Sequence, residues 1–227
     1  MLLSVIIPAY NEKNTILEIL NRIESVPIDK EIIIVDDGST DGTRELLDQY
    51  KNSKNIRVFL HPENKGKGMA IRTAIPHCTG DIIIIQDADL EYDPFDYLKL
   101  VEPFKNPLVK VIYGSRFMNP ENRHSYFRFY IGGRLLSFIT NLLYFQNLTD
   151  EPTCYKVFDA NFLKSIPLQC EKFEFCPEVT AKVAKKGIKI KEVSINYYPR
   201  TLDEGKKITW KDGLQAIWVL FKYRFTN

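Results

Sequence analysis

Short, uninterrupted apolar runs alternate with segments that open helices, and this alternation limits the fold more than any other feature of the sequence. A run that is apolar throughout predicts a strand buried on both faces of a sheet. Helices between such strands predict an α/β fold with right-handed crossovers, in which a mostly parallel central sheet is flanked by helices. The five predicted strands are Leu2–Pro8, Glu31–Val35, Ile56–Leu60, Asp81–Ile85 and Val109–Tyr113.

The second half of the chain has a different pattern. Tyr126–Phe145 is a long, aromatic-rich helical segment, and Thr153–Phe158 alternates apolar and polar residues, which is typical of an edge strand. A helix is predicted from Pro177, a strand over Ile188–Val193, and a last helix from its capping residue at position 209. Without a long linker or repeat, the chain is predicted to be one domain with a C-terminal helical extension.

Composition excludes several classes of protein. The 227 residues are 44% hydrophobic and 26% charged, which is sufficient for a globular core. The net charge of +2 gives no global field for nucleic acid, so we expect no such partner. The four cysteines lack the spacing of zinc ligands or redox pairs, which predicts reduced thiols in the cytoplasm. We find no signal peptide and no run of the roughly 18 apolar residues that a membrane span needs.

Polar clusters follow four of the five predicted strands. Since ligands collect beyond the carboxyl ends of strands in a parallel sheet, we expect these clusters to share one edge and to form a binding site there. The clusters are Tyr10-Asn11-Glu12, Asp36-Asp37-Gly38, Asp87-Ala88-Asp89 and Ser115-Arg116.

The Asp87-Ala88-Asp89 triplet is the strongest candidate for a metal site. Two carboxylates separated by one small residue, just past a buried strand, suit a hard cation that completes its coordination with substrate phosphates. The alternative for these residues is a solvated turn. The triplet alone leaves both interpretations open.

Two further motifs allow a nucleotide to bind. A carboxylate in Asp36-Asp37-Gly38-Ser39 would accept hydrogen bonds from a nucleobase or ribose, and the glycine lets backbone approach closely. Lys65-Gly66-Lys67-Gly68, at a predicted helix start, has the composition of an anion-binding loop. The alternatives are an Asx turn that caps a helix and a basic surface turn.

Taken together and in order, these segments resemble the family-2 glycosyltransferases of GT-A fold, and most closely the dolichyl- or polyprenyl-phosphate sugar synthase branch. The resemblance covers roughly residues 2–200. It divides the predicted domain into a nucleotide-sugar-binding half at 1–118, an acceptor half at 119–208 and a C-terminal amphipathic helix at 209–227. The segments that carry it are Val5–Glu12, Val35–Asp41, Asn64–Gly68 and Asp87–Asp89.

The resemblance implies roles for residues of the donor half. Asp87 and Asp89 would hold Mg²⁺ or Mn²⁺ together with the donor diphosphate, Glu91 would be a further metal contact, and Arg116 would contact phosphate. Pro8, Ala9, Tyr10, Glu12 and Asp37 would line the nucleobase and ribose pocket. The motifs above add Gly38, Lys65, Gly66 and Ala88 to the nucleotide-sugar-binding set.

Displacing a nucleoside diphosphate requires stabilisation of charge on the leaving phosphates, and we assign this to the metal with Arg200 and Lys206. A hydroxyl acceptor also needs a general base, for which Asp150 is the first candidate and Glu178 the second. A lipid-phosphate acceptor is already ionised and needs no base, so Asp150 would then orient a basic acceptor-binding residue. The catalytic set is therefore Asp89, Asp150 and Arg200, and the resemblance implies inversion at the anomeric carbon.

Leu148–Lys156 resembles the acceptor-side motif of the same branch, and Phe173–Lys182 and Tyr198–Lys207 resemble other segments of it. Lys156 stands where many lipid-phosphate synthases carry arginine. This departure matters for acceptor binding, because lysine cannot make the bidentate contact that arginine makes with phosphate.

Three functions follow from these observations. The first is a metal-dependent transferase that uses a UDP- or GDP-sugar and a polyprenyl-phosphate or other lipid-linked acceptor. The second transfers to a saccharide hydroxyl in surface or envelope glycan synthesis, and the third is a non-catalytic nucleotide-sugar-binding module. The helices predicted at Tyr126–Phe145 and Trp210–Phe225 either lie on the cytoplasmic face of a membrane or pack on the core or a second subunit. The nucleotide base, the sugar and the oligomeric state stay open.

Overall fold

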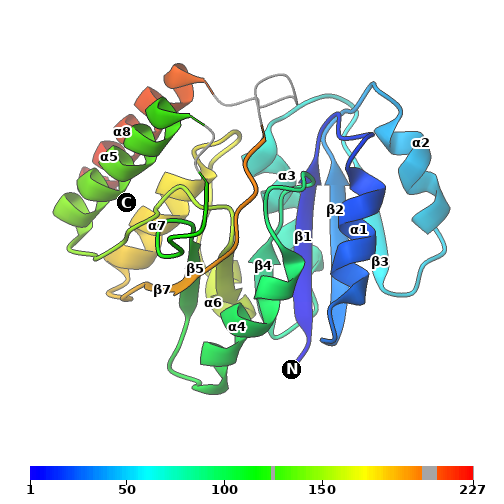
Figure 1. Cartoon of the computed structure of the whole chain (residues 1–227), viewed down its shortest axis with the longest axis horizontal. Coiled ribbons are helices and arrows are strands. Elements are labelled where there is room, and N and C mark those ends of the chain that lie inside the picture. Colours follow the sequence, from blue (N-terminus) through cyan, green and yellow to red (C-terminus); the bar gives the residue numbers. More distant parts are fainter. Residues whose placement is uncertain (124–125, 201–208, 227) are drawn as a thin grey trace.

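The computed structural model describes residues 1–123, 126–200 and 209–226. A seven-stranded sheet crosses the molecule in the order β3-β2-β1-β4-β6-β5-β7, with helices on both of its faces (Figure 1). Only β6 among these strands runs against its neighbours, so the predicted α/β class with a mostly parallel sheet is confirmed. The strands are β1 (Leu3–Ala9), β2 (Lys30–Asp36), β3 (Ile56–Leu60), β4 (Ile82–Ile85), β5 (Val111–Ser115), β6 (Lys156–Asp159) and β7 (Lys191–Ser194).

Helices connect these strands and extend the chain at its C-terminal end. They are α1 (Ile16–Ser25), α2 (Thr43–Leu47), α3 (Lys67–Ala74), α4 (Tyr97–Val101), α5 (Phe127–Tyr144), α6 (Ala160–Lys164), α7 (Phe175–Lys185) and α8 (Trp210–Phe225). Four short 3-10 helices lie at Asp48–Tyr50, Ile75–His77, Pro94–Asp96 and Glu102–Lys105. None of the helices in these described ranges is long and apolar enough to cross a membrane.

The core forms around the central strands because their side chains are apolar on both faces. Val5, Ile6 and Ile7 of β1 have no exposed surface, and the four isoleucines of β4 are at most 2% exposed. Burying apolar surface at this density is the main favourable term in folding. The polar residues directly after these runs, such as Asp36 and Gln86, are buried too, so each needs hydrogen-bond partners there.

The edge-strand prediction for Thr153–Phe158 is wrong. β6 lies inside the sheet, antiparallel between β4 and β5. Its polar member, Lys156, is fully buried because its ammonium donates to the carbonyl of Glu151 and lies 3.7 Å from the centre of the Tyr113 ring. The alternating pattern therefore does not mark a solvent face, since its polar side chain has partners inside the protein.

α5 and α8 pack side by side at one end of the molecule (Figure 1). Their inner faces join α7 in a second apolar cluster, and the Tyr144 hydroxyl donates to the carbonyl of Leu220 at 2.6 Å. The predicted cap of α8 is confirmed, since Thr209 and Asp212 form a reciprocal capping box. The outer faces of both helices stay apolar and exposed. The exposed residues are Phe127, Ile131, Leu135, Phe138, Leu142, Trp210, Leu214, Trp218, Phe221 and Phe225.

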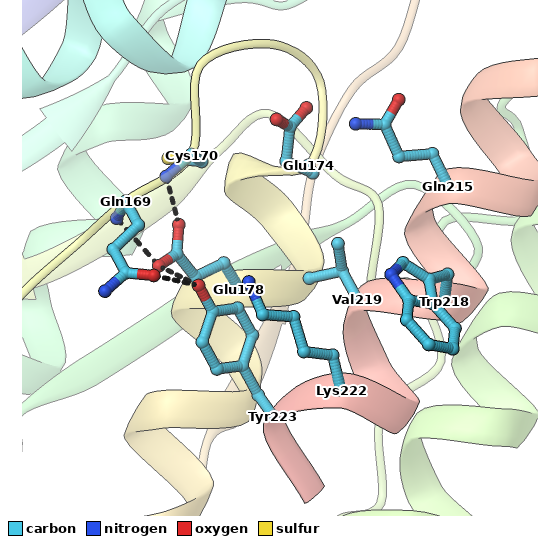
Figure 2. Close-up of a pocket in the computed structure, with 9 residues that line it drawn as sticks. All are labelled: Gln169, Cys170, Glu174, Glu178, Gln215, Trp218, Val219, Lys222 and Tyr223. Carbon is cyan, nitrogen blue, oxygen red and sulfur yellow. Dashed lines mark hydrogen bonds between the residues drawn. The ribbon is translucent and has the colours of Figure 1, made fainter. Parts of the chain in front are cut away.

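Glu178 of α7 links α8 to the rest of the fold by hydrogen bonds. Figure 2 shows its carboxylate among donors from two other segments: the backbone N–H groups of Gln169 and Cys170, and the Tyr223 hydroxyl of α8. Lys182 adds an ion pair at 2.6 Å. Burial by itself would raise the pKa of Glu178, but these hydrogen bonds together lower it below its ordinary value. Glu178 therefore supports the structure of this region.

Replacing Glu178 with alanine should destabilise the protein, because four donors would lose a buried acceptor. Breaking a buried ion pair costs about 3 kcal/mol or more. In a chain of this size that is a fall of roughly 6–12 °C in Tm, measurable by circular dichroism. The control is Glu18→Ala, whose partner Arg22 is exposed on α1, and which should change stability by less than about 1 kcal/mol. Equal Tm values for the two variants would contradict the assignment.

Candidate active site

A cavity of about 960 Å³ opens at the carboxyl ends of β1, β2 and β4 and continues toward α5 and α8. All four polar clusters that follow the predicted strands contribute to its lining, through Tyr10, Asp37, Asp87 and Arg116 among others. The prediction that these clusters share one edge of the sheet is thus confirmed. We call this cavity the cleft.

The turns after β1 and β2 hold each other in place at one end of the cleft. Asn11 adopts a left-handed conformation, with φ of 51°, and its side chain accepts a hydrogen bond from the N–H of Thr40. The N–H groups of Asn11 and Glu12 donate in turn to the hydroxyls of Ser39 and Thr43. These contacts fix the backbone next to the part of the cleft that Pro8, Ala9, Tyr10 and Glu12 line.

Asp37 organises the loop that leads into α3. Its carboxylate accepts hydrogen bonds from the N–H groups of Lys65 and Gly66 and contacts the His61 ring at 2.7 Å. Gly38 makes this possible, because a Cβ at its φ of +81° would lie 2.5 Å from the backbone of Asn64. Gly38 and Lys65 thus shape this end through their backbones and do not line the cleft, whereas Gly66 does.

Of the two lysines in the Lys65–Gly68 motif, Lys67 lines the cleft; it is the first residue of α3, and its ammonium pairs with Asp87. Burial opposes a charge on Lys67, but the Asp87 carboxylate outweighs this and raises the pKa of Lys67 above its ordinary value. The prediction named Lys65, whose side chain is exposed. Only the turn geometry at the start of α3 distinguishes the two lysines.

The carboxylates after β4 are held close together. Their strand end is fixed by Gln86, whose amide oxygen accepts hydrogen bonds from the buried hydroxyls of Tyr97 and Tyr155. Burial first, and then the neighbouring carboxylates of Asp87 and Glu91, raise the pKa of Asp89 to about 7. Because these negative charges repel one another, a positively charged partner nearby would stabilise them.

Arg200 is one such partner. Its guanidinium lies 2.8 Å from Asp89 and 3.1 Å from Glu12, and its Nε is buried without a hydrogen-bond partner in the described part of the chain. Glu91 holds Arg200 in position, because its carboxylate accepts hydrogen bonds from the Arg200 N–H and the Tyr197 hydroxyl. Lys206, the other cation predicted beside it, lies outside the described residues.

The chemistry of this end fits a divalent cation. Within residues 1–123, 126–200 and 209–226, no three acidic, histidine or cysteine side chains form a complete metal cage. However, Asp87 and Asp89 supply hard oxygen ligands, and cations of this kind are commonly bound by one or two carboxylates plus substrate phosphates. Lys67 and Arg200 balance the charge of these carboxylates in the structure.

Beside the hydrogen-bonded pair Glu91 and Tyr197, the cleft carries a fixed cation, Arg116. Its guanidinium makes two hydrogen bonds of 2.7 Å to the two carboxylate oxygens of Asp150, and its backbone N–H donates to the same carboxylate. Asp150 is fully buried and does not line the cleft, whereas Arg116 does. This geometry matches the predicted alternative in which Asp150 orients a basic residue.

A second guanidinium, Arg128 at the start of α5, also lines the cleft. It lies over the rings of Tyr126 and Phe129, at 5.4 and 5.1 Å from their centres. Aromatic faces orient a guanidinium without neutralising its charge. Arg116 and Arg128 together make this end of the cleft cationic.

Two residues named for the acceptor side lie away from the cleft. Lys156 points into the core beside Tyr113, and Glu178 is held by α8 and the loop before α7. The substitution of lysine for arginine at position 156 therefore does not alter the wall of the cleft. Sequence reasoning also missed His61, which bridges Asp37 and the Thr73 hydroxyl, although its place just after a predicted strand was a signal.

Comparison with known proteins agrees with this arrangement. The profile of the family described as glycosyl transferase family 2 matches residues 4–166. A UDP-N-acetylglucosamine–dolichyl-phosphate N-acetylglucosaminyltransferase of Methanococcus voltae is 33% identical over 213 residues, or 86% of this chain and 84% of that protein. A dolichol-phosphate mannosyltransferase of Pyrococcus furiosus is 27% identical over 211 residues, or 91% of this chain and 59% of that protein.

Solved structures give the fold. Glucosyl-3-phosphoglycerate synthase from Mycobacterium tuberculosis in complex with uridine diphosphate has a TM-score of 0.75 at 20% identity, over 98% of this chain and 79% of that chain. A complex of the same enzyme that also contains Mn²⁺ and glucosyl-3-phosphoglycerate has a TM-score of 0.73, over 97% of this chain and 79% of that chain. The chain therefore belongs to glycosyl transferase family 2, and it is a glycosyltransferase of the GT-A fold.

Proposed function

We propose that this chain transfers a sugar from a nucleotide-sugar to the phosphate of a polyprenyl lipid, with inversion at the anomeric carbon. The observation that carries the proposal is the polarity of the cleft. The cleft presents the carboxylates of Asp87 and Asp89, and beside the hydrogen-bonded pair Glu91 and Tyr197 it presents Arg116, held by the buried Asp150. The two relatives described above act, by their names, on dolichyl phosphate, which agrees with an anionic lipid acceptor.

The donor binds at the acidic end in this proposal. Pro8, Ala9, Tyr10, Glu12 and Asp37 surround the nucleoside, and Lys67 faces the diphosphate from the start of α3, where the helix dipole also favours anions. Asp87 and Asp89 would hold Mg²⁺ or Mn²⁺, which when bound stabilises negative charge on the leaving diphosphate. Arg200 adds a guanidinium at the same place, and its Nε has no hydrogen-bond partner among the described residues.

The displacement then needs little from the protein besides positioning. An oxygen of the acceptor phosphate attacks the anomeric carbon, the bond from that carbon to the donor's β-phosphate oxygen breaks, and the electron pair leaves on that oxygen. An ionised phosphate has no proton to lose, so no general base takes part. Arg116 and Arg128 would bind the acceptor phosphate, and Asp150 keeps Arg116 in its bidentate orientation.

Purified protein should release nucleoside diphosphate from one of a panel of UDP- and GDP-sugars, and release should rise sharply when undecaprenyl phosphate is added. Asp89→Asn should lower this turnover by about 100-fold, because it removes an electrostatic contact to the transition state. Asp48→Asn, an exposed partner of Lys51, is the control and should match wild type. If the release of nucleoside diphosphate does not change when the lipid is added, a saccharide acceptor is favoured. If the donor binds but no nucleoside diphosphate is released, a binding module is favoured.

Asp150→Asn separates a positioning role from a base. A positioning role predicts that acceptor KM rises, so that kcat/KM for the lipid falls about 30-fold, near the cost of breaking a buried charge pair. Donor KM and lipid-independent donor hydrolysis should stay unchanged, and Arg116→Lys should give the same pattern. A variant with normal acceptor KM and no transfer would instead make Asp150 the base.

The outer faces of α5 and α8 support a membrane location for the same reaction. Both helices expose an apolar stripe, and their basic residues outnumber Asp212, the one acidic residue of these two helices. An anionic lipid surface complements an exposed apolar stripe on helices with a net positive charge. The alternative of packing holds for the inner faces, and we assign the outer faces to a membrane.

The double variant Phe138→Ser, Trp218→Ser should lose most of its co-sedimentation with vesicles that contain anionic lipid. Both side chains are about two-thirds exposed, at 64% and 67%, so their loss should leave Tm unchanged. Leu108→Ser is the matched control, because Leu108 is 84% exposed far from both helices in the sequence. Binding by the double variant at the level of this control would argue against a membrane face.

A further inference from the structure

Beyond Arg116 and Arg128, the cleft continues as a groove between the N-terminal halves of α5 and α8. One wall of the groove is Phe129, Gly132, Gly133 and Leu136, and the other is Trp210, Gly213, Leu214 and Ile217. The two helices close on each other further along, where Tyr144 bonds to Leu220. The groove is therefore polar where it meets Arg116 and Arg128 and mostly apolar beyond them, with Thr209 and Asp212 on its α8 side.

Helix glycines line this groove without a packing reason. A Cβ built on Gly132 or Gly213 would have no other atom of the described residues within 4 Å, apart from its own helix and neighbours. A glycine in a helix interior weakens the helix relative to alanine, and close approach of another element is the usual compensation. The part of the chain that the structure describes places no such element at these two positions. Without side chains at Gly132 and Gly213, the groove is wider at these positions.

The volume of the cleft leaves room for an extended ligand. Sites for single small molecules usually enclose about 300–1,000 Å³, and the cleft, with about 960 Å³, lies at the upper end of that range. A ligand that extends from the cationic end into the groove must be anionic at its head and apolar along its tail. A saccharide does not fit this lining, because its hydroxyls would need polar partners.

We infer that the α5–α8 groove holds the first isoprene units of the acceptor lipid, and that Gly132 and Gly213 set the width that admits its branched chain. The inference rests on the proposed function and adds an acceptor subsite to it. The groove leads from the phosphate-binding arginines toward the exposed apolar stripes of the same two helices. A prenyl chain seated in it would pass from the reaction site toward the lipid phase along a mostly apolar wall, with Thr209 and Asp212 on the α8 side.

Gly132→Leu and Gly213→Leu test the inference by filling the groove. Both variants should fold, because the added side chain meets open space and leucine favours a helix. We expect kcat/KM for farnesyl and undecaprenyl phosphate to fall about tenfold or more, as for a steric change in an apolar pocket. The donor KM should not change. Gln215→Leu adds the same side chain to α8 at the separate hollow drawn in Figure 2, and it should behave as wild type.

The outcomes separate the two proposals. If wild type transfers to none of the prenyl phosphates, the proposed function itself fails. If wild type transfers and both leucine variants match it with undecaprenyl phosphate, the function stands and the groove assignment is overturned.

Calorimetric titration with geranyl phosphate and inorganic phosphate gives a second readout that does not depend on turnover. Wild type should bind geranyl phosphate about tenfold or more tightly than inorganic phosphate, and Gly213→Leu should lose this preference while it keeps its affinity for inorganic phosphate. Equal preference in the two proteins would also overturn the inference.

Discussion

Burying a carboxylate is costly unless donors surround it, and the donors around four buried carboxylates of this protein indicate what each of them does. Asp37 is held by backbone N–H groups, so it shapes a loop. Asp150 is held by a guanidinium, so it orients a cation that lines the cleft. Glu178 is held by donors from two other segments, so it joins α8 to the fold. Asp89, crowded by other carboxylates, is paired with Arg200.

The charges at the acidic end are balanced by side chains that also suit the donor. Lys67 and Arg200 neutralise Asp87 and Asp89 in the structure, and both are cations of the kind that bind diphosphate. A divalent metal that arrived with its diphosphate would bring a positive charge for the carboxylates and a negative one for the two cations. Each group would exchange one partner for another of the same sign, and no buried charge would be left alone. This exchange keeps a deeply buried site ready for highly charged ligands.

Much of the donor half follows from the sequence, because it depends on short-range pattern. The apolar runs fix the buried strands, and the polar residues after them must collect at one edge. The rest depends on contacts between distant segments. The sequence around Lys156 does not reveal that this side chain has its partners inside the core. For this reason the prediction that β6 is an edge strand is wrong. The pairing of Arg116 with Asp150 spans 34 residues, and it turns a candidate base into a residue that holds a guanidinium.

The antiparallel strand in the middle of the sheet has a consequence for the order of assembly. β5 does not touch β4, since β6 lies between them, and β7 pairs only with β5. During synthesis the strands β1 to β4 can therefore pair with one another as soon as residue 85 has left the ribosome. β5 must wait for Lys156–Asp159, and the nascent chain carries its acceptor-side segments undocked until then. The half of the cleft assigned to the nucleotide can thus fold first during synthesis. The half assigned to the lipid folds later and packs against it.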